Sequence, residues 1–176
     1  MKNILILTTF ILLAGCGFSP LYVQHSGGTW TSKDNYDTSI TYEMSQIRIT
    51  PISERFGQQI RNKLLDLISP KGAPTKAKYR LDVELDKKEV SQQAMRDDVT
   101  ATSERVDYTV NYKLYQGNTI LVSGDSFAFV SYDVLNNPYS TTMAQKKSEE
   151  NAANIIANDI ALRIGAYFHS SKSTAQ

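Results

Sequence analysis

The residues that could support acid–base or nucleophilic catalysis are few and widely separated. The two histidines, His25 and His169, lie in a predicted loop segment and a predicted C-terminal tail, away from any rigid element that could hold a catalytic geometry. Asp82, Glu84 and Asp86 recur at every second residue, which is the spacing of the solvent-facing side of a strand. No serine stands in a G-x-S-x-G motif, and no glycine-rich phosphate loop occurs. We therefore expect no enzymatic activity, no cofactor and no catalytic residue.

The single cysteine, Cys16, is suited to a different chemistry. It cannot form an internal disulfide, and no Cys/His spacing suits zinc. Residues 4–13 form an apolar run of signal-peptide length, well short of the ~20 residues that a membrane-spanning helix needs. "LAGC" at residues 13–16 resembles the bacterial lipobox, whose cysteine is diacylated, becomes the new amino terminus and is acylated there too. We predict a signal peptide over residues 1–15 and lipidation at Cys16.

This anchor also predicts a location. Three acyl chains hold a protein on a membrane essentially permanently, because each buried methylene contributes ~0.8 kcal/mol. Gly17 stands where an aspartate would resemble the signal that retains lipoproteins at the inner membrane, so the outer membrane of a Gram-negative cell is favoured. The alternative is an ordinary signal peptide followed by a chance cysteine.

Basic residues are the remaining candidates for binding. Lys and Arg total 19 against 18 Asp and Glu, so no overall basic field exists that would attract nucleic acid. The candidates for meeting anionic groups such as phosphates lie in a predicted turn, at the base of its hairpin and at the start of the last helix: Arg96, Lys87, Lys88, Lys146 and Lys147. The ordinary alternative is that each is a solvated surface charge.

The elements that must position these residues follow from hydrophobic periodicity. Strict alternation predicts strands over residues 46–50, 79–86, 106–114 and 119–134, with Gly124 as a bulge or bend. A 3.6-residue period predicts a helix with Thr50 as its N-cap and Pro51 as its first residue, ending near residue 68. A second helix is predicted from Tyr139 or Ser140 to about Phe168.

The order β-α-β-β-β-α predicts an α+β two-layer sandwich, in which a four-stranded mixed sheet carries both helices on one face and leaves the other face polar. The second and third strands should extend as a long hairpin with its turn near residues 96–98, and Phe127 and Phe129 should share one face of the fourth strand. Residues 16–41 are interpreted as a tether, 42–169 as the single domain and 170–176 as a disordered tail.

Three features together resemble one family. They are "CGFSPLY" at residues 16–22, the β-α-β-β-β-α order, and "NNPYS" at residues 136–140 ahead of a long helix. The whole mature chain is similar to the LptE family of lipopolysaccharide-assembly lipoproteins in its alphaproteobacterial form.

The resemblance implies partners: a lipoprotein of the outer membrane that plugs the LptD β-barrel, assists its assembly and binds lipopolysaccharide. The basic positions that the family uses are matched by Arg96 and by Lys146 or Lys147, whereas Asp97 and Asp98 beside Arg96 depart from a phosphate site. Alternatives are another envelope lipoprotein, such as a pilotin-like escort of a secretion channel or a peptidoglycan-associated binder, and, least favoured, a hydrolase.

Overall fold

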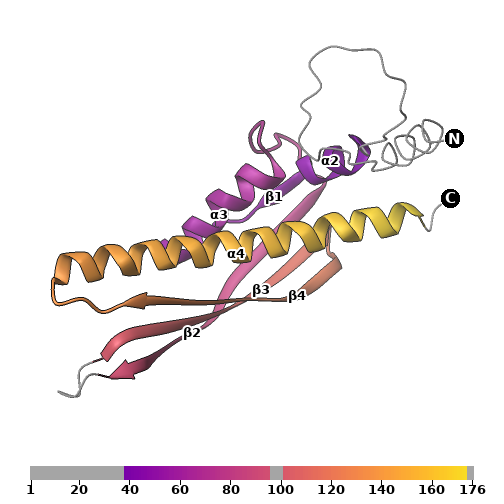
Figure 1. The fold of residues 1–176 in the computed structure, drawn as a ribbon. Coiled ribbons are helices and arrows are strands. Elements are labelled where there is room, and N and C mark those ends of the chain that lie inside the picture. The colour runs from indigo at the N-terminus through magenta and orange to yellow at the C-terminus, as the bar shows by residue number, and fades with distance from the viewer. Residues whose placement is uncertain (1–37, 96–100, 174–176) are drawn as a thin grey trace, which may run out of the picture. The chain divides into compact units, whose positions relative to one another are not determined.

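A computed structural model describes residues 38–95 and 101–173 (Figure 1). Within these ranges the chain forms seven elements. In chain order they are α2 (Thr38–Ser45), β1 (Ile47–Ile49), α3 (Glu54–Ile68), β2 (Tyr79–Met95), β3 (Ala101–Gln116), β4 (Thr119–Asp133) and α4 (Pro138–Ser173).

The four strands form one mixed sheet in the order β1-β2-β3-β4. β1 pairs with β2 in parallel, and the other neighbours are antiparallel. α3 and α4 lie on one face of this sheet (Figure 1). The predicted two-layer α+β sandwich is therefore confirmed, and α2 is an additional short helix that the sequence did not predict, because its eight residues show only weak amphipathic periodicity.

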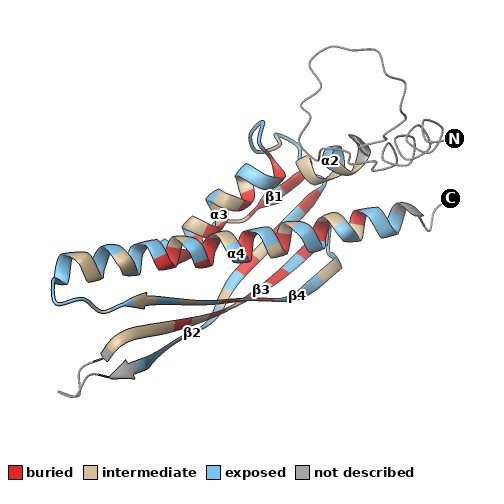
Figure 2. Cartoon of the chain, in the orientation of Figure 1, coloured by how far each residue is buried: buried red, intermediate tan, exposed pale blue. Residues whose placement is uncertain are grey.

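The core fills the space between the helices and the sheet, as Figure 2 shows. The strand positions that alternate toward the helices are buried, as are the α4 positions at three- and four-residue steps. They include Leu81, Tyr108, Val110, Tyr112 and Leu114 from the sheet and Ile156, Ile160 and Ile164 from α4. The predicted core faces of these strands and of α4 are thus confirmed.

The long β2–β3 hairpin is also confirmed. Its pairing runs from Arg80↔Tyr115 to Met95↔Ala101. The predicted turn near residues 96–98 lies outside the described residues. A register shift between Leu85 and Lys87 changes which residues of β2 face the helices.

The start of α3 was predicted too early. Thr50 still belongs to the strand edge, since its backbone N–H donates to the carbonyl oxygen of Leu81 at 3.0 Å and its hydroxyl donates to the same oxygen. The helix begins at Glu54, after Ser53 in the extended conformation typical of an N-cap. Ile52 is buried as part of the loop between strand and helix.

The predicted bulge at Gly124 is wrong. Gly124 pairs in register with Tyr112, and the irregularity of this ladder lies between Leu114 and Tyr115 instead. A Cβ at Gly124 would lie 3.1 Å from the Tyr112 hydroxyl oxygen. A glycine suits position 124 because the ring of Tyr112, on the neighbouring strand, covers the backbone there.

α4 is longer than the periodicity predicted. It begins at Pro138, because the side-chain oxygen of Asn137 accepts a hydrogen bond from the N–H of Tyr139 at 3.0 Å and caps the first turn. It continues past the predicted end near Phe168 to Ser173, so His169 lies on a helix and is exposed. Serine side chains bond to carbonyl oxygens of this last stretch, as Ser171 does to Phe168.

The face of the sheet opposite the helices is polar along β3, where Arg105, Asp107 and Lys113 lie. On β4, however, Phe127 and Phe129 share this face, as predicted for the pair, and are 49% and 60% exposed. The expectation of an entirely polar outer face therefore fails at β4.

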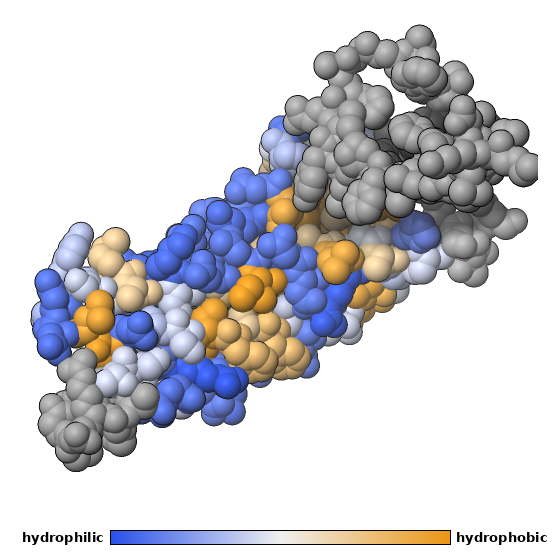
Figure 3. Space-filling model, viewed as in Figure 1, coloured by the Kyte–Doolittle hydropathy of each residue, from blue (hydrophilic) through white to orange (hydrophobic). Residues whose placement is uncertain are grey.

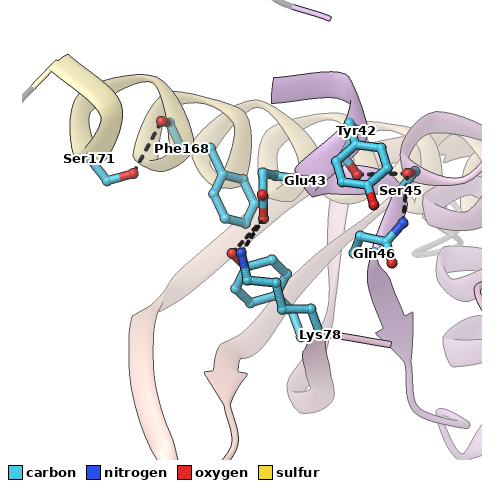
Figure 4. A network of polar contacts seen from close by, with 8 residues as sticks. Tyr42, Glu43, Ser45, Gln46, Lys78, Phe168 and Ser171 are labelled. Atoms are coloured by element: carbon cyan, nitrogen blue, oxygen red, sulfur yellow. Dashed lines mark hydrogen bonds and ion pairs between the residues drawn. The ribbon is translucent and has the colours of Figure 1, made fainter. Parts of the chain in front are cut away.

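Polar contacts hold α2 to the start of β2 (Figure 4). The carboxylate of Glu43 accepts hydrogen bonds from the Tyr79 hydroxyl at 2.6 Å and from Lys78 Nζ at 2.9 Å. These two donors hold the pKa of Glu43 below its usual value. The ring of Tyr79 packs against Phe168 of α4, with the ring centroids 5.1 Å apart.

Candidate functional site

A basic groove of about 360 Å³ lies between α3 and the first turns of α4. Its lining comprises four basic residues, one carboxylate, two amides and two apolar residues: Arg55, Lys63, Lys146, Lys147, Glu150, Gln59, Asn62, Met143 and Ala153. In Figure 3 the surface over α3 and the first turns of α4 is mostly hydrophilic, while hydrophobic residues gather nearer the middle of α4. We call this site the basic groove.

α4 supplies one wall of the basic groove through helical spacing. Met143, Lys146, Lys147 and Glu150 follow one another at steps of three, one and three residues, so they share one side of the helix. Buried Ala152, Ala153 and Ile156 turn the adjoining side of α4 toward the core. The packing of the apolar side therefore directs the lysines toward α3.

α3 supplies the other wall. Arg55, Gln59 and Lys63 recur every fourth residue, next to the buried stripe that includes Phe56, Ile60 and Leu64. The Oε1 atom of Gln59 is buried without a hydrogen-bond partner among the described residues. The wall thus carries a side-chain carbonyl oxygen that accepts no hydrogen bond from the described residues.

The charges of the basic groove are only partly compensated. Lys147 Nζ lies 3.0 Å from the carboxylate of Glu150. In residues 38–95 and 101–173, neither Lys63 nor Lys146 has an ion pair or hydrogen bond. The pKa of Glu150 is lowered, first by its hydrogen bond with Lys147 and further by the positive charge of Lys63. The groove therefore presents an excess of positive charge contributed by both helices.

Glu149 lies behind the basic groove and joins three elements. Its carboxylate is paired with the guanidinium of Arg55 on α3 and lies 3.5 Å from Nζ of Lys88 on β2. Only 10% of the Glu149 side chain is exposed, against 60% for Arg55. The buried carboxylate fixes one side of Arg55, while the other donors of the guanidinium remain available at the groove.

Tyr108 lies next to this carboxylate. Its ring stacks on Phe56 with the ring centroids 4.1 Å apart, and Lys88 Nζ lies 5.5 Å from its centroid. Burial, together with the negative charge of Glu149, raises the pKa of Tyr108 to about 12. The phenol therefore stays protonated at neutral pH and is not a base.

The structure brings together two of the predicted site residues, since Lys146 and Lys147 both line the basic groove. It separates the other predicted pair: Lys88 faces Glu149, whereas Lys87 lies on the opposite side of β2, 2.7 Å from Glu89. Arg96 and Cys16, together with His25, lie outside the residues that the structure describes.

Sequence reasoning missed Arg55 and Lys63. A polar helix side has the same spacing whether it faces water or a neighbouring helix, so their positions in the chain do not distinguish the two. One indication in the sequence is that Arg55, Gln59 and Lys63 recur every fourth residue, which places them on one side of the helix.

The basic groove can bind anions by charge and by hydrogen bonds from lysine, arginine and amide groups.

Within the described ranges, no group of His, Cys, Asp or Glu side chains could hold a metal ion. Over the same ranges, no helix has both the length and the apolar content to cross a membrane.

Several solved structures with the same fold are lipoproteins by name. A lipoprotein from Caulobacter crescentus CB15 is 22% identical with a TM-score of 0.62, and the match covers 76% of this chain and 97% of that one. Rare lipoprotein B from Shewanella oneidensis is 12% identical with a TM-score of 0.51, covering 73% and 97%. Lipoprotein B from Nitrosomonas europaea is 11% identical with a TM-score of 0.54, covering 70% and 83%. At such identities the likeness shows the fold alone.

Comparison with curated protein sequences finds no match. A family model does match, over residues 44–166, which span the sheet, α3 and most of α4 and thus include both walls of the basic groove. The description of this family is lipopolysaccharide assembly. The chain therefore belongs to the LptE family of lipopolysaccharide-assembly proteins.

Proposed function

We propose that this protein is a non-enzymatic outer-membrane lipoprotein that plugs an LptD-type β-barrel, assists its assembly and contacts lipopolysaccharide through the basic groove. Acyl chains on Cys16 hold it at the periplasmic side of the membrane, with the domain largely inside the barrel lumen. Membership of the lipopolysaccharide-assembly family supports the pathway.

The observation that carries the proposal is the basic groove itself. Lys146 and Lys147, the helix positions implied by the resemblance to the family, lie in one groove with Arg55 and Lys63. Lysine and arginine are the side chains that proteins use to hold phosphates, and lipopolysaccharide carries phosphate groups. The groove thus has the chemistry that contact with lipopolysaccharide requires.

The sheet face opposite the helices supports placement in a barrel. Along β3 it carries Arg105, Asp107, Asn111 and Lys113. The lumen of an outer-membrane barrel is itself polar, so such a surface can form hydrogen bonds with the lumen wall without burying an unpaired charge. Phe127 and Phe129 would then require an apolar patch on that wall.

Affinity purification tests this proposal. The tagged, lipidated protein is isolated from detergent-solubilised outer membranes, and the proteins that accompany it are identified by mass spectrometry. We expect one large β-barrel in near-stoichiometric amount, and impaired delivery of lipopolysaccharide to the cell surface when the protein is depleted. Recovery with a secretion channel or with peptidoglycan, and without an LptD-type barrel, would contradict the proposal.

A further inference from the structure

The basic groove has two walls, and the resemblance to the family points only to the lysines of the α4 wall. The α3 wall carries Arg55 and Lys63, which face Lys146 and Lys147 from a helix that begins 84 residues earlier in the chain, at Glu54 rather than Pro138. Two cations on separate helices can approach one anionic group from opposite sides, which a single helix face cannot do.

We propose that α3 supplies half of the lipopolysaccharide-binding site, in which Lys63 and Arg55 join Lys146 in holding one phosphate group between the two helices. This inference rests on the proposed function and specifies which chemical group of the ligand the basic groove holds.

The lysines of the basic groove differ in whether they form an ion pair. Neither Lys63 nor Lys146 forms an ion pair within the described part of the chain, although the charge of Lys63 acts on Glu150, whereas Lys147 Nζ is 3.0 Å from the Glu150 carboxylate. An unpaired ammonium group binds a phosphate without first giving up an ion pair. Lys63 and Lys146 should therefore contribute more to binding than Lys147.

The guanidinium of Arg55 is held in a fixed orientation by an ion pair. The buried carboxylate of Glu149 pairs with one of its nitrogens, and the side chain is still 60% exposed. A guanidinium held from behind keeps several N–H donors pointing outward in a fixed plane, which suits a phosphate better than a free side chain does. Gln59 lies one helical turn from both Arg55 and Lys63. Its Nε2 group, unlike its Oε1 atom, can donate a further hydrogen bond to a phosphate.

The charged groups of the basic groove favour an anionic ligand. The lining has four basic residues against one carboxylate, that of Glu150. Ala153 is fully buried in the floor, whereas Met143 is half-exposed and offers apolar surface. The four cations therefore select a phosphate, and lipopolysaccharide without phosphates separates this charge contact from an apolar contact at Met143.

The test measures binding of purified lipopolysaccharide to the full-length protein in detergent, for the wild type and four variants. The variants are Lys63→Gln, Lys146→Gln, the double variant, and Lys71→Gln as a control that removes an exposed lysine from the loop after α3. Each is also measured with lipopolysaccharide whose phosphates have been removed, and with inorganic pyrophosphate as competitor. Thermal unfolding checks that each variant is folded.

We expect Lys63→Gln and Lys146→Gln each to weaken binding about three- to tenfold, since each removes a charge-assisted contact in a half-open groove. The losses should be less than additive in the double variant, because both lysines hold the same group. Lys71→Gln should bind like the wild type. Removing the phosphates should weaken wild-type binding and abolish the difference between the wild type and Lys63→Gln.

Two results would overturn the inference while leaving the proposed function intact: equal binding by Lys63→Gln and the wild type, or an effect of Lys63→Gln that persists without phosphates. Displacement by pyrophosphate at the same concentration as lipopolysaccharide would show a general phosphate site and overturn the assignment to the lipid. If the wild type does not bind lipopolysaccharide, that result instead contradicts the lipopolysaccharide contact in the proposed function itself.

Discussion

Glu149 shows how a single residue ties the site to the fold. It is the only charged side chain buried in the part of the chain that the structure describes, and its partners come from α3 and β2. Replacing it with alanine leaves two cations without their carboxylate. We expect Glu149→Ala to lower the free energy of unfolding by about 1–3 kcal/mol, less than for a fully buried pair because Arg55 and Lys88 are partly exposed.

The neighbouring residue provides the control. Glu150 is also paired with a lysine but its side chain is 45% exposed, so Glu150→Ala should change the free energy of unfolding much less than Glu149→Ala does. Urea denaturation of both variants makes the comparison. Equal losses would show that Glu149 does not join the three elements.

Two buried tyrosines differ in how their hydroxyl groups are used. The hydroxyl of Tyr108 has no hydrogen-bond partner among the described residues, whereas that of Tyr79 donates to Glu43 at 2.6 Å. Tyr108→Phe should therefore leave the free energy of unfolding unchanged or raise it by up to about 1 kcal/mol, and Tyr79→Phe should lower it by about 1–2 kcal/mol. Chemical denaturation tests both, and a loss of stability in Tyr108→Phe would show that its hydroxyl has a partner.

At the scale of the element, the loop before α3 depends on a glycine. A Cβ at Gly57 would lie 2.4 Å from the Cγ2 atom of Ile52, the buried residue of that loop. Gly57→Ala should therefore lower the free energy of unfolding by about 1–3 kcal/mol, although alanine favours a helix more than glycine does.

Gly165 on α4 is the matched control for this prediction. A Cβ there would make an ordinary contact with Met44 Sδ at 3.7 Å, so Gly165→Ala should raise the free energy of unfolding by up to about 1 kcal/mol. Thermal melts of the two variants give the sign of each effect. A stabilising Gly57→Ala would mean that the loop adjusts at no cost.

The attachment of α2 should depend on pH. The pKa of Glu43 is lowered in the folded protein by hydrogen bonds from Tyr79 and Lys78, so the native state favours the ionised carboxylate. Its contribution to stability is complete above the ordinary pKa of 4.5 and is lost as the pH falls through the folded pKa. Glu43→Gln should therefore weaken protection of α2 at neutral pH and reduce the change in protection between about pH 6 and pH 3. Hydrogen exchange measured on α2 shows both effects, and an unchanged pH dependence would contradict the assignment.

At the scale of the whole molecule, the proposed lipidation site, Cys16, precedes in the chain every residue of the described core. Cys16→Ser should prevent lipidation and normal signal cleavage while leaving the domain folded, because the core comprises residues from Ile47 to Phe168. Membrane fractionation, mass of the mature chain and circular dichroism test this. Unchanged anchoring of the variant would show that another feature holds the protein to the membrane.

The sequence alone determined the order of the strands and long helices, the extended β2–β3 hairpin and the resemblance to LptE, because alternation and helical periodicity are local properties. It misplaced the start of α3, since Thr50-Pro51 has the form of a helix start and only the pairing with Leu81 reveals a strand edge. It could not detect α2, whose position depends on contacts with Tyr79 and α4.

The tertiary structure alone decided the site. Lys146 and Lys147 were identified as candidates from the chain, but the chain could not show that Arg55 and Lys63 lie opposite them. The contact between Arg55 and Glu149 joins residues 94 positions apart. A charged helix side has the same sequence pattern in solvent and at a helix–helix groove, and only the packing of the apolar sides on one sheet determines which polar sides meet.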